Sequence, residues 1–206
     1  MPSLTNVRLS KRAFAYNPSI TIHSIAKLCC SPIDVGALAG VFMKPDSLAT
    51  ANVHSIAELH GLETTIKTIM VDNNSCNDED FTQLDLSPFV NLMRFEVGSF
   101  SFAYVVKFHV YNMQFLESII IGEKSFVDNT IGFEDDVTYG ELSITECPNL
   151  RELRIGYYCF KYCLSFSLRN LSSLETFDMG NVKISTDSFM LSSFEMKSII
   201  HYGFNE

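Results

Sequence analysis

A pattern of seven residues recurs along the chain, with leucine at its first position, apolar residues at its fourth and sixth, and glycine at its seventh. Complete copies span residues 92–98, 116–122, 150–156 and 174–180. Apolar residues two positions apart lie on the same face of a strand, and a glycine permits a sharp turn after it. Each copy therefore predicts a short strand with one buried face, followed by a turn.

A second apolar pattern precedes each copy, with two alternating residues and then two more at intervals of three. It spans residues 84–92, 108–116, 142–150 and 166–174. Alternation again predicts a strand, whereas residues three apart share one side of a tight or 3₁₀-like turn. An apolar residue also stands four positions beyond each glycine, namely Phe102, Phe126, Phe160 and Ile184. We expect the phenylalanines at this position to stack into an aromatic spine.

The same register extends towards both ends of the chain. It is matched at residues 4–10 and 20–28, and less completely at 33–36, 66–72 and 200–203. Two near-identical segments, 23–28 and 54–59, support it. Together the matches predict one domain over 1–206, with about eight turns of about 24 residues that are complete between 84 and 180. Longer spacings between turns place insertions near 37–50, 61–65 and 127–139.

A strand that is buried on one face needs neighbours, and stacked copies about 4.8 Å apart share a continuous core. The predicted fold class is therefore a β-rich solenoid with parallel strands, short 3₁₀ or turn elements and little long helix. The register already begins at Leu4 and continues to Gly203, three residues from the end. We therefore expect a fragment that is incomplete at both ends, a protein that associates with itself through uncapped apolar ends, or a degenerate copy of a repeat protein.

With this register the sequence resembles the leucine-rich-repeat superfamily, and within it the BspA-like proteins. The motif of that group, Ile-Gly-x-x-Ala-Phe-x-x-Cys, is similar to Ile155-Gly-Tyr-Tyr-Cys-Phe160-Lys-Tyr-Cys163 and in part to residues 121–126 and 9–14. The resemblance implies a leucine-rich-repeat solenoid without catalytic groups. BspA-like proteins are often surface proteins of bacteria and protists that contact host or matrix proteins. An adhesin-like surface module, or a fragment of a larger repeat protein, is therefore the alternative function that the resemblance implies.

Composition and charge narrow the range of partners. Hydrophobic residues make up 47% of the 206 residues, which excludes a disordered chain. The net charge is −9 and the basic residues are scattered, so nucleic acid is not an expected partner. We find no signal peptide and no apolar run long enough for a membrane span, which predicts a cytoplasmic protein that does not bind membranes. A surface location would follow if the chain is a fragment.

No pattern of a catalytic, metal or cofactor site is present. The six cysteines are irregularly spaced and are expected to be reduced thiols in or near the core. The five histidines follow repeat positions and are expected to be structural or exposed. The acidic run at 72–80 has the composition of a calcium loop but lacks the mid-loop glycine and closing glutamate of an EF-hand, so it predicts a solvated loop. The chain is therefore predicted not to be an enzyme and to need no cofactor.

A binding surface is expected on the outward face of the first strand of each repeat. Side chains between the core positions point away from the core. In the central repeats these are Arg94, Glu96, Ser118, Ile120, Glu152, Arg154, Thr176 and Asp178. They predict a non-catalytic protein-binding scaffold that uses a face of mixed charge, with a protein partner of unknown identity. The alternative is a strand face in contact with solvent alone.

Overall fold

The computed structural model describes residues 6–9, 20–23, 50–127, 140–180, 188–189 and 192–197. Within these residues the chain is β-rich, with two parallel sheets and one helix, α1 (Ile56–His60), of five residues. The predictions of parallel strands and little long helix are confirmed. In the described part of the chain, no helix is long and apolar enough to cross a membrane.

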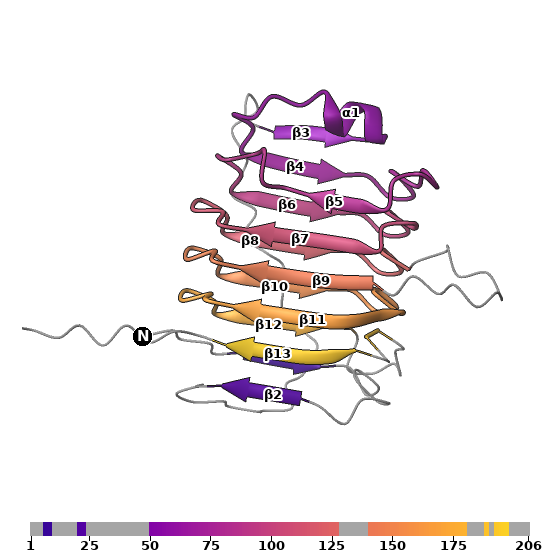
Figure 1. The fold of residues 1–206 in the computed structure, drawn as a ribbon. Helices are drawn as coiled ribbons and strands as arrows, with labels where there is room; N and C mark the ends of the chain where they lie inside the picture. The colour runs from indigo at the N-terminus through magenta and orange to yellow at the C-terminus, as the bar shows by residue number, and fades with distance from the viewer. Residues whose placement is uncertain are drawn as a thin grey trace, which may run out of the picture.

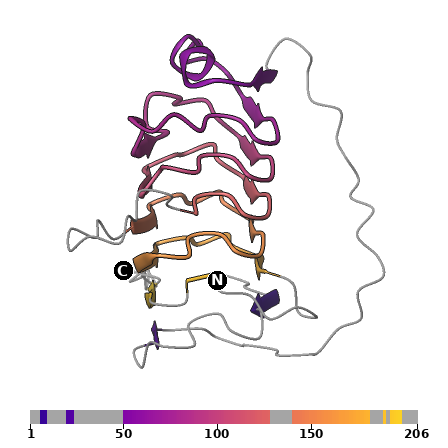
Figure 2. The same ribbon diagram turned by 90° about the vertical axis from the view of Figure 1, so that its right-hand side faces the viewer.

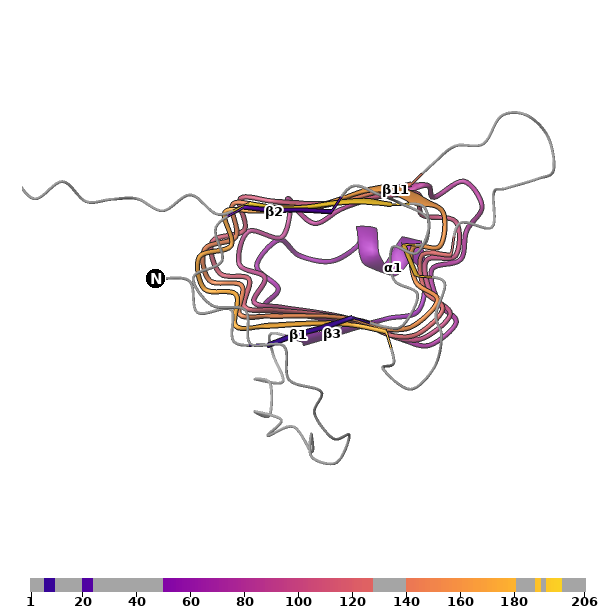
Figure 3. The ribbon, with the colours of Figure 1, turned by 90° about the horizontal axis from the view of Figure 1, so that it is seen from below.

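Two sheets of parallel strands form the long walls of the molecule (Figure 1, Figure 3). Sheet A has the order β1 (Asn6–Leu9), β12 (Thr176–Met179), β10 (Glu152–Ile155), β8 (Ser118–Ile121), β6 (Arg94–Val97), β4 (Thr68–Val71), β3 (Thr50–Val53). Sheet B has the order β2 (Ile20–His23), β13 (Ser193–Lys197), β11 (Cys163–Arg169), β9 (Gly140–Thr145), β7 (Lys107–Tyr111), β5 (Gln83–Asp85). From β4 to β13 the chain alternates between the sheets, and we call a strand of sheet A with the next strand of sheet B a rung.

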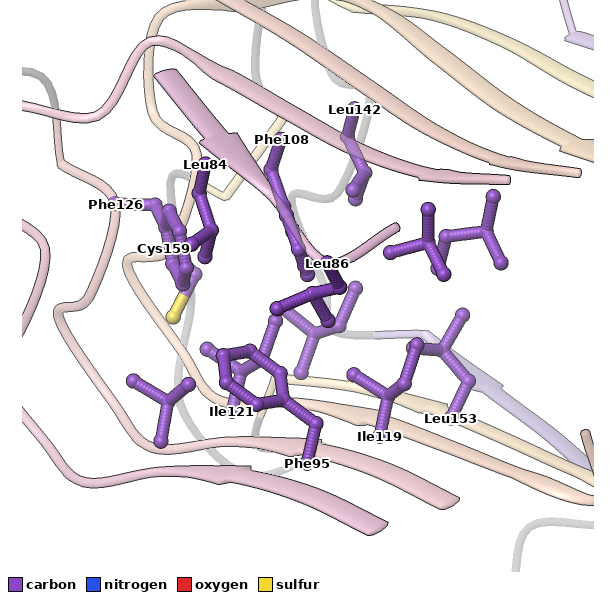
Figure 4. Packing of buried hydrophobic residues seen from close by; sticks show 14 of the residues in the cluster. Leu84, Leu86, Phe95, Phe108, Ile119, Ile121, Phe126, Leu142, Leu153 and Cys159 are labelled. Carbon is purple, nitrogen blue, oxygen red and sulfur yellow. The ribbon is translucent and has the colours of Figure 1, made fainter. Parts of the chain in front are cut away.

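The register of sheet A places equivalent repeat positions side by side. Phe95 of β6 is aligned with Ile119 of β8, and Ile119 is aligned with Leu153 of β10. These side chains are fully buried and face Phe108 and Leu142 of sheet B across the core (Figure 4). The alternating apolar pattern of the sequence therefore corresponds to two inward faces that enclose one continuous core.

Tight turns lead from β5, β9 and β11 of sheet B to the next strand of sheet A. The Leu92 amide donates to the Phe89 carbonyl at 2.9 Å, and the Leu150 amide donates to the Cys147 carbonyl at 3.2 Å. All four side chains are buried. The interval of three in the sequence thus corresponds to a turn whose two apolar residues both point inward, as predicted.

The expected aromatic spine is present. Ring centroids are separated by 5.2 Å between Phe102 and Phe126, by 4.7 Å between Phe126 and Phe160, and by 5.1 Å between Phe160 and Phe189. In the rung of β12, the position four residues beyond the glycine is Ile184, and Phe189 stacks on Phe160. Ile184 lies outside the described residues, and the spine position of this rung comes five residues later than in the others.

Helix α1 closes the core at the β3 end of the stack (Figure 1, Figure 3). The Ser55 side chain accepts a hydrogen bond from the Glu58 amide, and the Glu58 carboxylate accepts one from the His54 amide, an arrangement close to a capping box. Leu59 is buried in the core, and a loop over 61–65 then leads to β4. The apolar core is therefore covered by α1 at this end of the stack.

The first rung, β1 with β2, lies at the opposite end of the stack from β3 (Figure 1, Figure 2). Strand β1 pairs with β12, and β2 pairs with β13. The order of rungs in space therefore differs from their order in the chain. The predicted features at 33–36 and 200–203 lie outside the described residues, as do 37–49 and 128–139 of the predicted insertions.

Candidate functional site

The segments that follow the strands of sheet A stack closely at one corner of the molecule. A Cβ added at Gly122 would lie 2.6 Å from the Ser99 amide nitrogen, and one added at Gly156 would lie 2.5 Å from the Glu123 nitrogen. Real Cβ atoms essentially never approach backbone atoms so closely. Both glycines are therefore required because the backbone of the neighbouring rung passes close by, and neither has a positive φ.

Two residues in each of these corner segments have a left-handed backbone. The first stands two positions beyond the glycine position and the second four positions beyond it. In successive rungs these pairs are Asn74 and Cys76, Phe100 and Phe102, Lys124 and Phe126, and Tyr158 and Phe160. The residues of the second column are buried, whereas Asn74 and Phe100 of the first are exposed. The alternation thus presents one column of side chains to solvent along the corner.

A ladder of buried hydroxyl and thiol groups lies between these two columns. The Ser125 hydroxyl accepts a hydrogen bond from the Ser101 amide and donates one to the Gly98 carbonyl, at 3.2 and 2.8 Å. The Cys159 thiol donates to the Gly122 carbonyl at 3.0 Å in the same way. Each group therefore satisfies backbone atoms of the preceding rung that would otherwise be buried without partners.

The acidic run at 72–80 is part of this corner, and its prediction as a solvated loop is wrong for its centre. Ser75 and Cys76 are buried, because Ser75 belongs to the hydroxyl ladder and Cys76 occupies the spine position of its rung. The side chain of Asn77 forms two hydrogen bonds with the neighbouring rung. Its NH₂ group donates to the Phe100 carbonyl at 3.0 Å, and its oxygen accepts from the Ala103 backbone amide at 2.8 Å.

The four cysteines in the described part of the chain are free and buried, as predicted. Burial raises the pKa of the Cys159 and Cys163 thiols to about 12 in each case. Burial is also the main cause that raises the pKa of Cys147 to about 11. At neutral pH these groups are therefore protonated thiols with little nucleophilic character. The described residues contain no group of three or more potential metal ligands, and Cys29 and Cys30 lie outside them.

A groove of about 510 Å³ runs along the outer side of the corner and crosses four rungs. We call it the corner groove. The residues that line it are Asn74, Asn77, Phe100, Ala103, Tyr104, Lys124, Val127, Tyr158 and Lys161. All of these residues except Tyr104 stand either two or five positions beyond the glycine position of their rung. Phe100 is 46% exposed and is one of several large apolar side chains that are exposed in the described part of the chain.

The charge of the corner groove is opposite to that of the chain as a whole. Its lining residues include two lysines and no aspartate or glutamate, although the net charge of the chain is −9. The Lys124 ammonium lies 5.2 Å from the centroid of the Phe100 ring and 5.9 Å from that of Tyr157, and the Lys161 ammonium lies 5.1 Å from that of Tyr162. These cation–π contacts hold both cations beside aromatic rings.

The eight residues predicted as a binding surface do lie together on the outer face of sheet A. They form two columns, aligned in register, in β6, β8, β10 and β12: Arg94, Ser118, Glu152 and Thr176, and Glu96, Ile120, Arg154 and Asp178. Ser118 is buried and the other seven are half-buried. The predicted adjacency is confirmed, whereas no observation tests whether this face binds a partner.

The charges on this face largely pair with one another. Arg94 forms an ion pair with Glu96. Arg154 lies 2.6 Å from a Glu152 carboxylate oxygen and 3.9 Å from one of Asp178. A partner would have to replace these contacts, so the outer face of sheet A offers less unsatisfied charge than the sequence alone indicated.

A smaller depression lies on the outer face of sheet B. Its volume is about 240 Å³, and its lining is rich in hydroxyl groups from β9, β11 and β13. Arg169 and Glu195 in its lining form an ion pair with each other. Ser143 and Thr145 are within 3.4 Å of each other, and Ser193 donates to the Leu164 carbonyl. The polar groups of this depression are thus engaged locally.

Sequence reasoning missed the corner groove because it followed only the strands. The signal was nonetheless present, since Phe100, Lys124 and Tyr158 stand at the same distance beyond Gly98, Gly122 and Gly156. The missing information was the path of the corner backbone, which is left-handed at these outward positions and again at the buried spine positions two residues later. In comparisons with protein-family models, curated proteins and solved structures, nothing matches this chain.

Proposed function

We propose that this chain is a leucine-rich-repeat solenoid that acts as a non-catalytic protein-binding scaffold, and that the corner groove is its recognition site. The observation that carries the proposal is a groove with an exposed phenylalanine, two tyrosines and two lysines but no acidic lining residue, in a chain of net charge −9. Exposed aromatic and cationic side chains in a concave site are typical of surfaces that bind other proteins.

The proposed occupant is an extended, acidic segment of a partner protein that also carries an aromatic side chain. Four rungs spaced by about 4.8 Å give the corner groove a length of about 14 Å, which is about four residues of extended chain. Carboxylates of the segment would meet Lys124 and Lys161, and its aromatic ring would pack against Phe100. Regular repeat spacing supports the solenoid assignment, as do the close-packed glycines and the stacked phenylalanines.

Charge reversal in the corner groove tests this function. A fluorescein-labelled peptide of alternating aspartate and phenylalanine is titrated with the protein, and fluorescence anisotropy is measured. We expect Lys124→Glu combined with Lys161→Glu to weaken binding by about tenfold or more, which corresponds to about 1.4 kcal/mol. Phe100→Asn should weaken it as well while keeping the left-handed backbone, because Asn74 occupies the equivalent position one rung away.

The matched control reverses Lys67 and Lys107, which are exposed and lie outside the corner groove. It changes the net charge by the same amount and should leave binding within about twofold, apart from long-range steering. Equal losses in the two double variants would contradict the proposal. So would equal affinity for a peptide with lysine in place of aspartate.

A second candidate site is the outer face of sheet A, which is supported by the continuous alignment of its two columns over four strands. Its test is a double variant that combines Glu96→Gln with Arg154→Gln, in which capture of a partner is measured. Neutral substitutions avoid adding a third carboxylate beside Glu152 and Asp178, which charge reversal at Arg154 would do. Loss of partner capture with an unchanged circular dichroism spectrum would favour this face over the corner groove.

The alternative of an adhesin-like surface module differs from a cytoplasmic scaffold in where the protein is found. Fractionation of cells that express the native gene, followed by detection of this chain, separates the two. Recovery in the cytosolic fraction alone would exclude the adhesin, whereas recovery at the surface would exclude the cytoplasmic scaffold.

A further inference from the structure

The first rung of this chain completes the far end of the stack. Strand β1 adds to β12 at the edge of sheet A, and β2 adds to β13 at the edge of sheet B. The next strand in the chain, β3, forms the opposite edge of sheet A. Residues at the beginning of the chain thus cover strands that come more than 150 residues later.

The pairing of β1 with β12 repeats the pairing between neighbouring rungs elsewhere. Val7 is aligned with Phe177, and Leu9 with Met179. On the other side of β12, the same two residues are aligned with Leu153 and Ile155 of β10. Strand β2 continues sheet B in the same way, with Ile20 aligned with Phe194. The first rung therefore has the register of an ordinary repeat, and the edge that it covers would accept any repeat of matching sequence.

The connection between the first rung and β3 does not require both to belong to the same stack. Sheet A has six strand spacings between β1 and β3, which is about 29 Å at 4.8 Å each. The 26 residues from 24 to 49 reach about 86 Å when fully extended. Chain length therefore permits the first rung to pair within its own molecule or with a neighbouring one.

We propose that this chain forms a strand-exchanged dimer, in which the first rung of each copy pairs with β12 and β13 of the other. The partner of this surface is thus a second copy of the chain. Reciprocal exchange uses the same contacts as the closed monomer and gives a dimer with two-fold symmetry. The connection gives the first rung an effective concentration next to β12 and β13 of its own molecule. Pairing within one molecule prevails when the protein concentration is below this value, and exchange prevails when it is above.

Cysteine cross-linking in the full chain tests the exchange. Arg8 and Asp178 are register partners on adjacent strands, at a Cα separation of about 4.8 Å that a disulfide can span. Arg8→Cys and Asp178→Cys are introduced into separate copies, each with Cys29→Ser and Cys30→Ser. The copies are mixed, unfolded, refolded together at high protein concentration and oxidised. The remaining native cysteines in the described part of the chain are buried.

We expect a disulfide-linked heterodimer on a non-reducing gel, at about tenfold the yield of a control pair, because disulfides form only between close positions. The control pair carries Glu96→Cys and Asp178→Cys, which lie three strands apart on the same face. A single copy with both Arg8→Cys and Asp178→Cys, refolded when dilute, should give a cross-linked monomer. Circular dichroism checks that every variant folds.

Each outcome decides the proposal. A cross-linked monomer without any heterodimer at high concentration would overturn the exchange, and no cross-link in the double variant would overturn the pairing itself. Equal yields from the test and control pairs would show random collision and would also overturn the exchange. The readout does not involve the corner groove, so it is independent of the proposed function.

Discussion

The hydroxyl ladder explains why serine recurs at a fully buried position of the repeat. Ser101, Ser125 and Ser188 are 0% exposed, although serine is usually a surface residue. Each hydroxyl can donate and accept one hydrogen bond at once, and the corner leaves one amide and one carbonyl to be satisfied in each rung. Cys159 takes the same place with a thiol, because sulfur also donates and accepts, though more weakly.

Ser125→Ala is expected to destabilise the protein. The substitution leaves the Ser101 amide without its acceptor and the Gly98 carbonyl without its donor, which should lower the free energy of unfolding by about 2 kcal/mol. Ser125→Cys should cost less than about 1 kcal/mol, since the thiol keeps weaker versions of both bonds. Urea unfolding followed by circular dichroism measures both, and equal losses would contradict the retention of these two hydrogen bonds by a thiol.

The buried thiols make stability sensitive to alkaline pH. Burial raises the pKa of Cys159 from 9.0 to about 12, so the folded state keeps the proton after the unfolded chain has lost it. The stabilisation is fully present below pH 9 and is lost as the pH rises towards 12.

Cys159→Ser should therefore reduce the alkaline loss of stability. Each such thiol contributes a slope of about 1 kcal/mol per pH unit between the two pKa values, and the variant lacks one of them. The free energy of unfolding, measured across this pH range, should fall less steeply than in the parent chain. Parallel pH profiles for the two proteins would contradict the assignment.

At the level of the element, the corner segments show why the glycine position can be occupied by Asp72. The sequence suggested that glycine is needed for a turn, whereas the structure shows that Gly98, Gly122 and Gly156 are needed for close stacking. Asp72 occupies this position in the rung that packs on β3. After β3 the chain forms α1 in place of a corner segment, which leaves room for the Asp72 side chain. The Asp72 carboxylate lies 2.8 Å from the ring of His54.

Gly122→Ala should therefore destabilise the protein although its φ is not positive. The new methyl group would meet the backbone of residues 98 and 99, and separating the two rungs should cost about 3 kcal/mol. Gly61→Ala is the control, because its Cβ would lie 3.4 Å from the nearest atom at the end of α1, in ordinary contact. Thermal unfolding of the two variants measures the difference, and equal melting temperatures would contradict close stacking as the reason for glycine.

The near-identical segments 23–28 and 54–59 show where local sequence stops being informative. His23 ends β2 in sheet B, whereas His54 follows β3 in sheet A and the residues after it form α1. Similar sequences thus follow strands of different sheets. Strand β3 is an edge strand of sheet A, and Leu59 of the segment that follows it is buried in the core.

On the scale of the whole molecule, the stacking order and the groove both depend on contacts between distant residues. The repeat pattern predicted that residues 4–10 form a strand, and β1 lies there. It could not predict that this strand pairs with β12, because every rung presents nearly the same edge. The corner groove likewise exists only once rungs 24 to 34 residues apart are stacked in register.

Sequence by itself determined the described strands other than β3 and β13, their inward faces, the tight turns and the phenylalanine stack, because each follows from the period of apolar residues along the chain. It also placed the eight outer residues of sheet A together, since alternation fixes which side chains point outward. Only the tertiary structure decided the position of the first rung, the helix that covers the β3 end and the left-handed corners that form the groove. These depend on which edges and backbones meet, and equivalent repeats do not encode that choice locally.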